Sequence, residues 1–246
     1  MPKTIKLTIA YDGTAFVGWQ RQEQGVSIQG AIEEALATID GAAVTLHGAG
    51  RTDAGVHALA QVASARISAQ LDDPTMARAL NANLPEAIRI TAVETVTDDF
   101  HARFSATGKF YEYRIWNGPA IPPFIRLYAW HVPEPLNLAA MQEAARAIVG
   151  EHDFAGFRSA QSVNHTTVRR VWNAEWHASS DGLLVFHISG NGFMRHMVRS
   201  LAGTLVEVGR GQRPAPDLAR LLRTPDRSAA GRTAPPHGLF LVKVAY

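Results

Sequence analysis

The chain of 246 residues contains no cysteine. Without thiols it can build neither a disulfide framework nor a zinc site with thiolate ligands. It also has no uncharged apolar run near the roughly 18 to 20 residues that a membrane helix needs, and residues 1–6 lack the apolar core of a signal peptide. We therefore predict that the protein is neither exported nor membrane-spanning, and that it resides in the cytoplasm.

Several common catalytic motifs are missing as well. Three Gly-x-Gly pairs occur, but the third glycine of a dinucleotide fingerprint is replaced by Asp53, Arg195 or Pro214. There is no Gly-x-x-x-x-Gly-Lys phosphate loop and no Gly-x-Ser-x-Gly nucleophile elbow, and the ten histidines include no His-Glu-x-x-His pair. We therefore predict neither a bound cofactor nor a metal site.

Charge is unevenly distributed along the chain. The whole sequence has 24 basic and 22 acidic residues, which gives a formal net charge of +2. The stretch 195–232 contains eight arginines and three acids, so it carries +5 and the remainder carries −3. Arginine suits forked contacts with phosphate, and such a basic region is typical of an RNA-binding surface. A solvated helical face that happens to use arginine is the alternative interpretation.

Hydrophobic periodicity predicts the secondary structure. Ile5, Leu7 and Ile9 alternate with polar or small residues, which indicates a half-buried strand. Ser27 is a favourable N-cap for a helix that ends before Gly41. The same reasoning predicts further strands at residues 57–67, 88–96, 109–116, 168–177, 183–188 and 239–244, and further helices at 73–84, 138–149 and 193–208.

These elements fall into two successive halves, each with several strands and two principal helices. This order predicts an α+β architecture with an N-terminal domain at residues 1–105 and a C-terminal domain at 106–246. No Gly/Ser-rich linker separates the halves, so we expect them to share one packed interface.

The run Gly50–Ala58 presents one carboxylate, Asp53, in a stretch that is typical of a loop between two strands. Glycines at 48, 50 and 55 let the backbone bend sharply there, so the acid is offered outward by a loop. For an isolated Gly-x-x-Asp-x-Gly the favoured interpretation is a turn whose Asp bonds its own backbone. A run of nine residues in this order is less easily explained by a turn alone.

This run resembles the active-site motif of the tRNA pseudouridine synthase A family. Five further segments match the family in the expected order: Tyr11–Gln20, Lys109–Arg114, Glu151–Arg158, Phe193–Arg199 and Pro235–Leu241. The chain departs from the family where members often have a second histidine before His196, because it has Arg195 there. The resemblance implies an isomerase of the pseudouridine synthase fold, two α+β domains that flank a basic central cleft, and a homodimer.

The resemblance also implies roles for single residues. Asp53 is the catalytic residue, and Arg199 is its cationic partner. Asp53 could add to C6 of the uracil or to C1′ of the sugar, or stabilise charge while a glycal forms, and the sequence leaves these routes open. Tyr111 has a ring that can stack on the base and a hydroxyl that can sit near C5, although a tyrosine packed in the sheet is its alternative role.

The implied substrate is the tRNA anticodon stem-loop, with uridines 38, 39 and 40 as targets. A stem nucleotide must be flipped out of its duplex, and Arg51 is suitably placed to support the vacated stack or simply to contact phosphate. The predicted substrate-binding residues are Arg51, His57, Lys109, Tyr111, Arg158, Arg169, Arg170 and Leu241.

Two rival hypotheses remain open. The first is a catalytically silent RNA-binding protein that uses the same basic surface but not Asp53. The second is a pseudouridine synthase aimed at another RNA, which the tRNA-family resemblance of Tyr11–Gln20 argues against.

Overall fold

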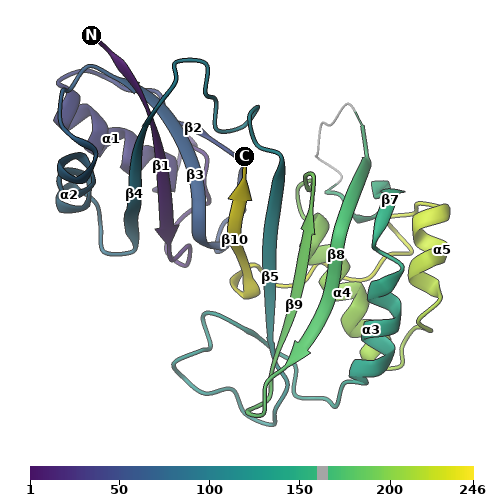
Figure 1. Ribbon diagram of the computed structural model, residues 1–246. Helices are drawn as coiled ribbons and strands as arrows, with labels where there is room; N and C mark the ends of the chain where they lie inside the picture. Colours follow the sequence, from purple (N-terminus) through teal and green to yellow (C-terminus); the bar gives the residue numbers. More distant parts are fainter. Residues whose placement is uncertain (160–165) are drawn as a thin grey trace. The chain divides into compact units, whose positions relative to one another are not determined.

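The computed structural model describes residues 1–159 and 166–246, which form two compact units (Figure 1). The first unit comprises Met1–Thr107 together with Leu241–Tyr246, and the second comprises Gly108–Phe240. Each unit combines strands with helices, so the predicted α+β class is confirmed. The domain limits 1–105 and 106–246 stay a proposal, and they differ from the observed units in the placement of Ala106, Thr107 and the last six residues.

The sheet of the first unit has the strand order β4-β1-β3-β10, with β2 added to β3. Its strands are β1 (Lys3–Tyr11), β2 (His47–Gly48), β3 (His57–Ile67), β4 (Ile88–Val96) and β10 (Leu239–Ala245). β1 lies antiparallel to both β3 and β4, and Leu7 is paired with Ala63 and Val93. The alternation predicted for β1 is confirmed, because Ile5, Leu7 and Ile9 are all fully buried on one face.

Two helices complete the first unit, α1 (Ile28–Asp40) and α2 (Asp73–Asn83), and they pack against each other. The predicted ends of α1 are confirmed. Ser27 Oγ accepts a hydrogen bond from Gly30 N at 3.1 Å, and Gly41 closes the helix in the left-handed conformation at φ 76°.

The sheet of the second unit has the order β5-β9-β8-β7, with the short strand β6 parallel to β5. Its strands are β5 (Gly108–Trp116), β6 (Trp130–His131), β7 (Gly150–Asp153), β8 (Val168–Ala178) and β9 (Leu183–Gly190). Its α-helices are α3 (Leu138–Arg146), α4 (Met197–Gly209) and α5 (Asp217–Arg223), and its 3₁₀ turns are η1 (Ala155–Phe157) and η2 (Pro236–Gly238). α3 contacts α4, α5 and β8 (Figure 1).

α4 is the central helix of this unit, because all but two of its thirteen residues are buried. It begins later than the predicted start at residue 193. His196 has φ 66°, the left-handed conformation, so the helix begins only at Met197. The helix predicted for 138–149 likewise ends earlier, at Arg146.

No helix in the described ranges, 1–159 and 166–246, is long and apolar enough to cross a membrane.

Candidate active site

Asp53 lies on a loop that connects β2 to β3, as predicted. The two strands pair antiparallel at His47 with Ser64 and at Gly48 with Ala63, so the loop leaves and re-enters the same sheet. Asp53 is half-buried, and its carbonyl accepts a hydrogen bond from Val56 N at 3.1 Å. Gly55 in between has φ 75°, which closes this turn at little steric cost. The loop therefore holds Asp53 in a closed turn.

The segment Tyr11–Gln20 packs directly against this loop. A Cβ at Gly18 would lie 2.8 Å from Thr52 O, and a Cβ at Gly13 would lie 2.0 Å from Val56 O. Trp19 N also donates a hydrogen bond to Thr52 O at 3.1 Å. The backbones of the two segments approach so closely that only glycine fits at these two positions.

Buried polar groups support the loop from beneath. Tyr11 Oη and Thr52 Oγ1 lie 2.7 Å apart, and Gln61 Nε2 donates to Gly50 O at 2.9 Å. Burial raises the pKa of Tyr11 to about 12, so its phenol is neutral at physiological pH. His57 is 1% exposed, and its Nδ1 lies 3.1 Å from both Gly13 N and Asp12 Oδ1. The loop is thus fixed by side chains that solvent does not reach.

In the second unit, Tyr111 and Lys109 lie two residues apart on β5, so both side chains point to the same face of the sheet. Tyr111 is 9% exposed and is paired with Ile188 of β9. The edge of the Phe193 ring meets the Tyr111 ring with centroids 5.2 Å apart. This contact holds the tyrosine ring in one orientation.

Arg199 projects from the first turn of α4. Its Nε donates to Ala234 O at 2.8 Å, and Ala234 N donates back to Arg199 O at 3.1 Å. Helix and segment touch through their backbones, because a Cβ at Gly203 would lie 1.8 Å from Arg232 O. Arg199 is therefore positioned by the stretch that follows α5 as well as by its own helix.

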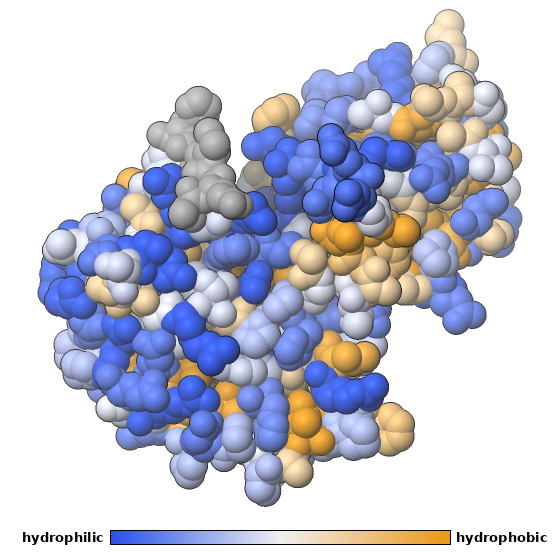
Figure 2. Space-filling model, turned by 180° about the vertical axis from the view of Figure 1, so that it is seen from behind, coloured by the Kyte–Doolittle hydropathy of each residue, from blue (hydrophilic) through white to orange (hydrophobic). Residues whose placement is uncertain are grey.

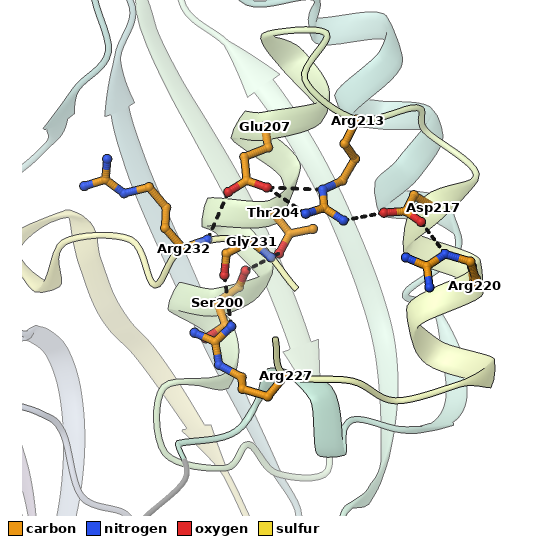
Figure 3. Close-up of polar contacts among 9 residues, drawn as sticks. All are labelled: Ser200, Thr204, Glu207, Arg213, Asp217, Arg220, Arg227, Gly231 and Arg232. Carbon is orange, nitrogen blue, oxygen red and sulfur yellow. Dashed lines mark hydrogen bonds and ion pairs between the residues drawn. The ribbon is translucent and has the colours of Figure 1, made fainter. Parts of the chain in front are cut away.

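Further hydrogen bonds join α4 to that stretch (Figure 3). Gly231 N donates to Thr204 Oγ1, and Arg232 N donates to Glu207 Oε1, both at 3.0 Å. Thr204 Oγ1 in turn donates to Ser200 O at 2.8 Å. Thr204 is fully buried, so these bonds are shielded from water.

Several arginines of the basic stretch 195–232 already have partners within the second unit (Figure 3). Arg213 bonds Glu207 Oε2 through Nη2 at 2.8 Å and also bonds Asp217. Arg220 Nε donates to Asp217 Oδ1 at 2.5 Å. The hydrogen bonds from Arg220 and Arg213 hold the pKa of the Asp217 carboxyl below its usual value.

Two more arginines of this stretch, Arg210 and Arg227, also form hydrogen bonds within the second unit. Arg210 Nη2 donates to Glu134 Oε2 at 2.8 Å, and Arg227 donates to Gly231 O and Thr233 Oγ1 at 3.1 and 2.9 Å. Glu207 and Asp217 are already subtracted in the net charge of +5, so only the pair of Arg210 with Glu134 lowers the charge of the stretch further, to +4. Arg223 is exposed and forms no ion pair within the described ranges.

The other predicted binding residues differ in their exposure. Arg170 is exposed on β8, and Arg158 is half-buried just after η1. Arg169 donates to Thr166 O at 3.0 Å, and burial lowers the pKa of its guanidinium. Leu241 is 0% exposed in β10, so it belongs to the core of the first unit.

The predicted site residues divide between the two units. Asp53, Arg51, His57 and Leu241 belong to the first unit, and Tyr111, Lys109, Arg158, Arg169, Arg170 and Arg199 belong to the second. The partnership of Asp53 with residues of the second unit stays a prediction. Sequence reasoning missed the support of the loop by Tyr11, Thr52 and Gln61, for which the glycine spacing in Tyr11–Gln20 was the available signal.

Comparison with known proteins identifies the class of protein to which this arrangement belongs. A family model described as tRNA pseudouridine synthase matches residues 7–105 and 144–246. The chain therefore belongs to the tRNA pseudouridine synthase family, and the predicted resemblance is confirmed.

Curated relatives that carry the name tRNA pseudouridine synthase A match nearly the whole chain. The protein from Solidesulfovibrio magneticus is 48% identical over 98% of this chain and 90% of its own length. That from Geobacter sulfurreducens is 46% identical over 99% of this chain and 100% of its own length. The protein from Syntrophotalea carbinolica is 44% identical over 98% of this chain and 96% of its own length.

Among solved structures, a Cbf5-Nop10-Gar1 complex aligns with 96% of this chain and 48% of its own chain, at 12% identity and a TM-score of 0.40. This chain thus spans about half the length of that one, and at this score the alignment carries no conclusion.

Proposed function

We propose that the protein is a tRNA pseudouridine synthase that isomerises uridine to pseudouridine in the anticodon stem-loop, at positions 38, 39 and 40. The carrying observation is the Asp53 loop, whose carboxylate is held on a buried support in a chain that belongs to this family. The near full-length likeness to relatives named tRNA pseudouridine synthase A supports tRNA as the substrate.

The isomerisation of uridine to pseudouridine rearranges bonds within one nucleotide. The bond from uracil N1 to the ribose C1′ breaks, and a bond from C5 to C1′ forms. The hydrogen on C5 leaves as a proton and N1 gains one, so there is no redox change. A single carboxylate suffices for this chemistry, and Asp53 is the residue proposed for it, whether it adds to C6, adds to C1′ or stabilises a glycal route.

Two residues of the second unit are proposed to complete the catalytic set. Arg199 supplies the cation that pairs with the carboxylate of Asp53. Tyr111 stacks on the extracted base, and its hydroxyl stands near C5, where the proton leaves. The edge contact with Phe193 and the bond from Arg199 Nε to Ala234 O support this proposal, because both side chains are already oriented without substrate.

The remaining residues are proposed to bind the RNA. Arg51 is exposed on the catalytic loop and supports the stack that the flipped nucleotide vacates, or contacts phosphate. Lys109, Arg158, Arg169 and Arg170 are proposed as phosphate contacts. Since His57 and Leu241 are buried, their proposed contribution is indirect, as support for the site from the core of the first unit. A homodimer and a cytoplasmic location complete the proposal, on family resemblance alone.

The test is release of tritium from C5-labelled uridine in bulk tRNA, because isomerisation expels that hydrogen. We expect release by the wild type and none by Asp53→Asn, while tRNA affinity survives, since phosphate contacts supply most of the binding. Mapping the modified positions checks the anticodon stem-loop. Normal turnover by Asp53→Asn would refute the catalytic assignment, and tRNA binding without any release by the wild type would favour a silent RNA-binding protein.

Arg199→Ala provides a second, independent check of the catalytic set. We expect it to reduce tritium release strongly at saturating tRNA, because the carboxylate loses its proposed partner. Arg199→Lys keeps the charge but not the planar fork, and it should fall between wild type and Arg199→Ala. Unchanged turnover in Arg199→Ala would remove Arg199 from the catalytic set.

A further inference from the structure

Four side chains of the first unit form a continuous row of three tilted rings and one guanidinium, here named the stack. The ring centroids of His47 and His101 are 4.9 Å apart, and those of His101 and Phe104 are 4.4 Å apart. The guanidinium carbon of Arg103 lies 5.7 Å from the Phe104 centroid, within range of a cation–π contact. His47 belongs to β2, the strand that leads into the loop of Asp53.

The open end of this stack faces water. Phe104 is 78% exposed, and His47 and Arg103 are exposed as well. Exposed apolar residues are ordinary on the surface of folded proteins, and the face shown in Figure 2 has some among its hydrophilic residues. Phe104 differs because its ring continues a row of other rings and a cation. Phe124, at 90% exposure, has no ring neighbour within the described ranges.

The stack is held rigid by the turn that carries it. His101 Nδ1 accepts hydrogen bonds from Arg103 N at 3.1 Å and Phe104 N at 3.4 Å, which fixes the imidazole against the turn. Ser105 N donates to His101 O at 2.9 Å. Ala102 is fully buried, and its N donates to Ser64 Oγ at 3.1 Å.

A second anchor acts from the other side of the same turn. Tyr246 Oη donates to Ala102 O at 2.8 Å, and the Tyr246 ring packs on Phe100 with centroids 5.0 Å apart. The exposed ring of Phe104 is therefore presented by a fixed backbone, and little conformational entropy remains to be lost when a flat ligand stacks on it.

The charge of the first unit narrows the kind of ligand. Its residues, 1–107 and 241–246, include nine basic and twelve acidic side chains, a net charge of −3. A polyanion therefore gains little from this unit as a whole. A nucleobase can instead stack on the ring of Phe104, and the guanidinium of Arg103 can bind the phosphate next to that base.

We propose that the stack of His47, His101, Phe104 and Arg103 binds an unpaired base of the substrate RNA, with the base on the outer face of Phe104 and its phosphate at Arg103. A paired base offers no free face for such stacking, so the site takes single-stranded nucleotides. This inference rests on the proposed function only for the identity of the RNA as tRNA. The stacking of a base on Phe104 and the phosphate contact of Arg103 do not depend on it.

The test compares Phe104→Leu with Phe104→Trp. Leucine keeps an apolar side chain but removes the π-face, whereas tryptophan keeps it. With bulk tRNA and with a single-stranded oligouridine, we expect Phe104→Leu to bind about 5- to 150-fold more weakly, the range known for loss of one stacked base, and Phe104→Trp to bind at least as well as wild type. A blunt RNA duplex should bind both variants equally.

Arg103 is tested by the salt dependence of binding. Arg103→Gln should reduce the slope of log affinity against log salt by about 1 for tRNA, and Phe104→Leu should leave that slope unchanged. Arg66→Gln is the matched control, because Arg66 is exposed in the same unit but is paired with Asp98 at 3.5 Å. Thermal unfolding should show all four variants as stable as wild type, since the altered side chains are exposed.

Two outcomes would overturn the inference. One is wild-type affinity of Phe104→Leu for both bulk tRNA and the single-stranded oligouridine, and the other is an equal loss of affinity for the blunt duplex. Absence of tritium release by the wild type would instead count against the proposed function, and the binding data would still decide the stacking site.

Discussion

Tyr11 and Thr52 share a buried hydrogen bond of 2.7 Å, which joins the end of β1 to the residue next to Asp53. Tyr11 is 4% exposed and Thr52 is 9% exposed, so neither hydroxyl can exchange this bond for water. The position of the candidate catalytic carboxylate thus depends on a contact between residues far apart in the sequence.

Tyr11→Phe removes this bond and leaves the Thr52 hydroxyl without its buried partner. We expect a loss of about 1 to 2 kcal/mol in the free energy of unfolding, measured by urea denaturation, and a fall in kcat with tRNA affinity preserved. Thr52→Ser keeps a hydroxyl and should retain most of the activity, whereas Thr52→Val should behave like Tyr11→Phe. Equal kcat in Tyr11→Phe and wild type would show that the loop does not need this bond.

Gly18→Ala should displace the loop of Asp53. Gly18 has φ 106°, and an added Cβ would lie 2.8 Å from Thr52 O and 3.1 Å from Ala54 N, all of them backbone atoms that cannot swing aside. We expect turnover to fall by at least about tenfold, since small misplacements of a catalytic group are costly.

Gly41→Ala is the control for Gly18→Ala. Gly41 also has a positive φ, 76°, but nothing lies within 4 Å of an added Cβ. It should lose about 1 to 2 kcal/mol of stability through backbone strain alone and keep its turnover. Similar losses of turnover in both variants would indicate general destabilisation and not displacement of the loop.

Asp217→Asn tests the ion-pair network of α5. Bonds from Arg220 and Arg213 depress the pKa of Asp217 in the folded state, so its stabilising effect is present above the unfolded pKa of about 3.9 and is lost as pH falls through the folded value. We expect wild type to exceed the variant in urea midpoint at pH 7 and 5, and the difference to shrink as the pH falls further below the unfolded pKa. Glu86→Gln, a change at an exposed acid, should be neutral at every pH.

Arg223→Gln and Arg213→Gln should separate RNA contacts from structural ion pairs. Arg223 is exposed, so its removal should lower the salt slope of tRNA binding by about 1 and leave stability unchanged if α5 touches phosphate. Arg213 bridges Glu207 and Asp217, so its removal should lower stability and leave the slope unchanged. An unaltered slope in both variants would exclude α5 from the RNA path.

The sequence was sufficient wherever local rules decide the structure. Alternation at Ile5, Leu7 and Ile9 predicted β1, and the pair Ser27 and Gly41 predicted both ends of α1. The Asp53 loop was predicted because glycine is needed at a sharp turn whatever the surroundings.

What the sequence could not predict depends on partners distant in the chain. Arg210 looks like a free cation until Glu134, 76 residues away, is brought to it by the fold. The start of α4 was missed because His196 adopts a left-handed conformation that no local pattern signals. The bond from Tyr11 to Thr52, beside Asp53, was missed because a tyrosine at the end of a strand is ordinarily a packing residue.

The placement of β10 has a consequence for the order in which the protein is assembled. Its last five residues belong to the first unit, where Thr107 N donates to Ala245 O at 2.9 Å, although the whole second unit is synthesised in between. While the chain emerges from the ribosome, the first unit therefore lacks β10, a neighbour of β3 in its sheet. The second unit ends at Phe240, so all of it is synthesised before the last six residues of the first unit. The second unit can therefore fold first. The N-terminal unit, which is synthesised earliest, is completed last.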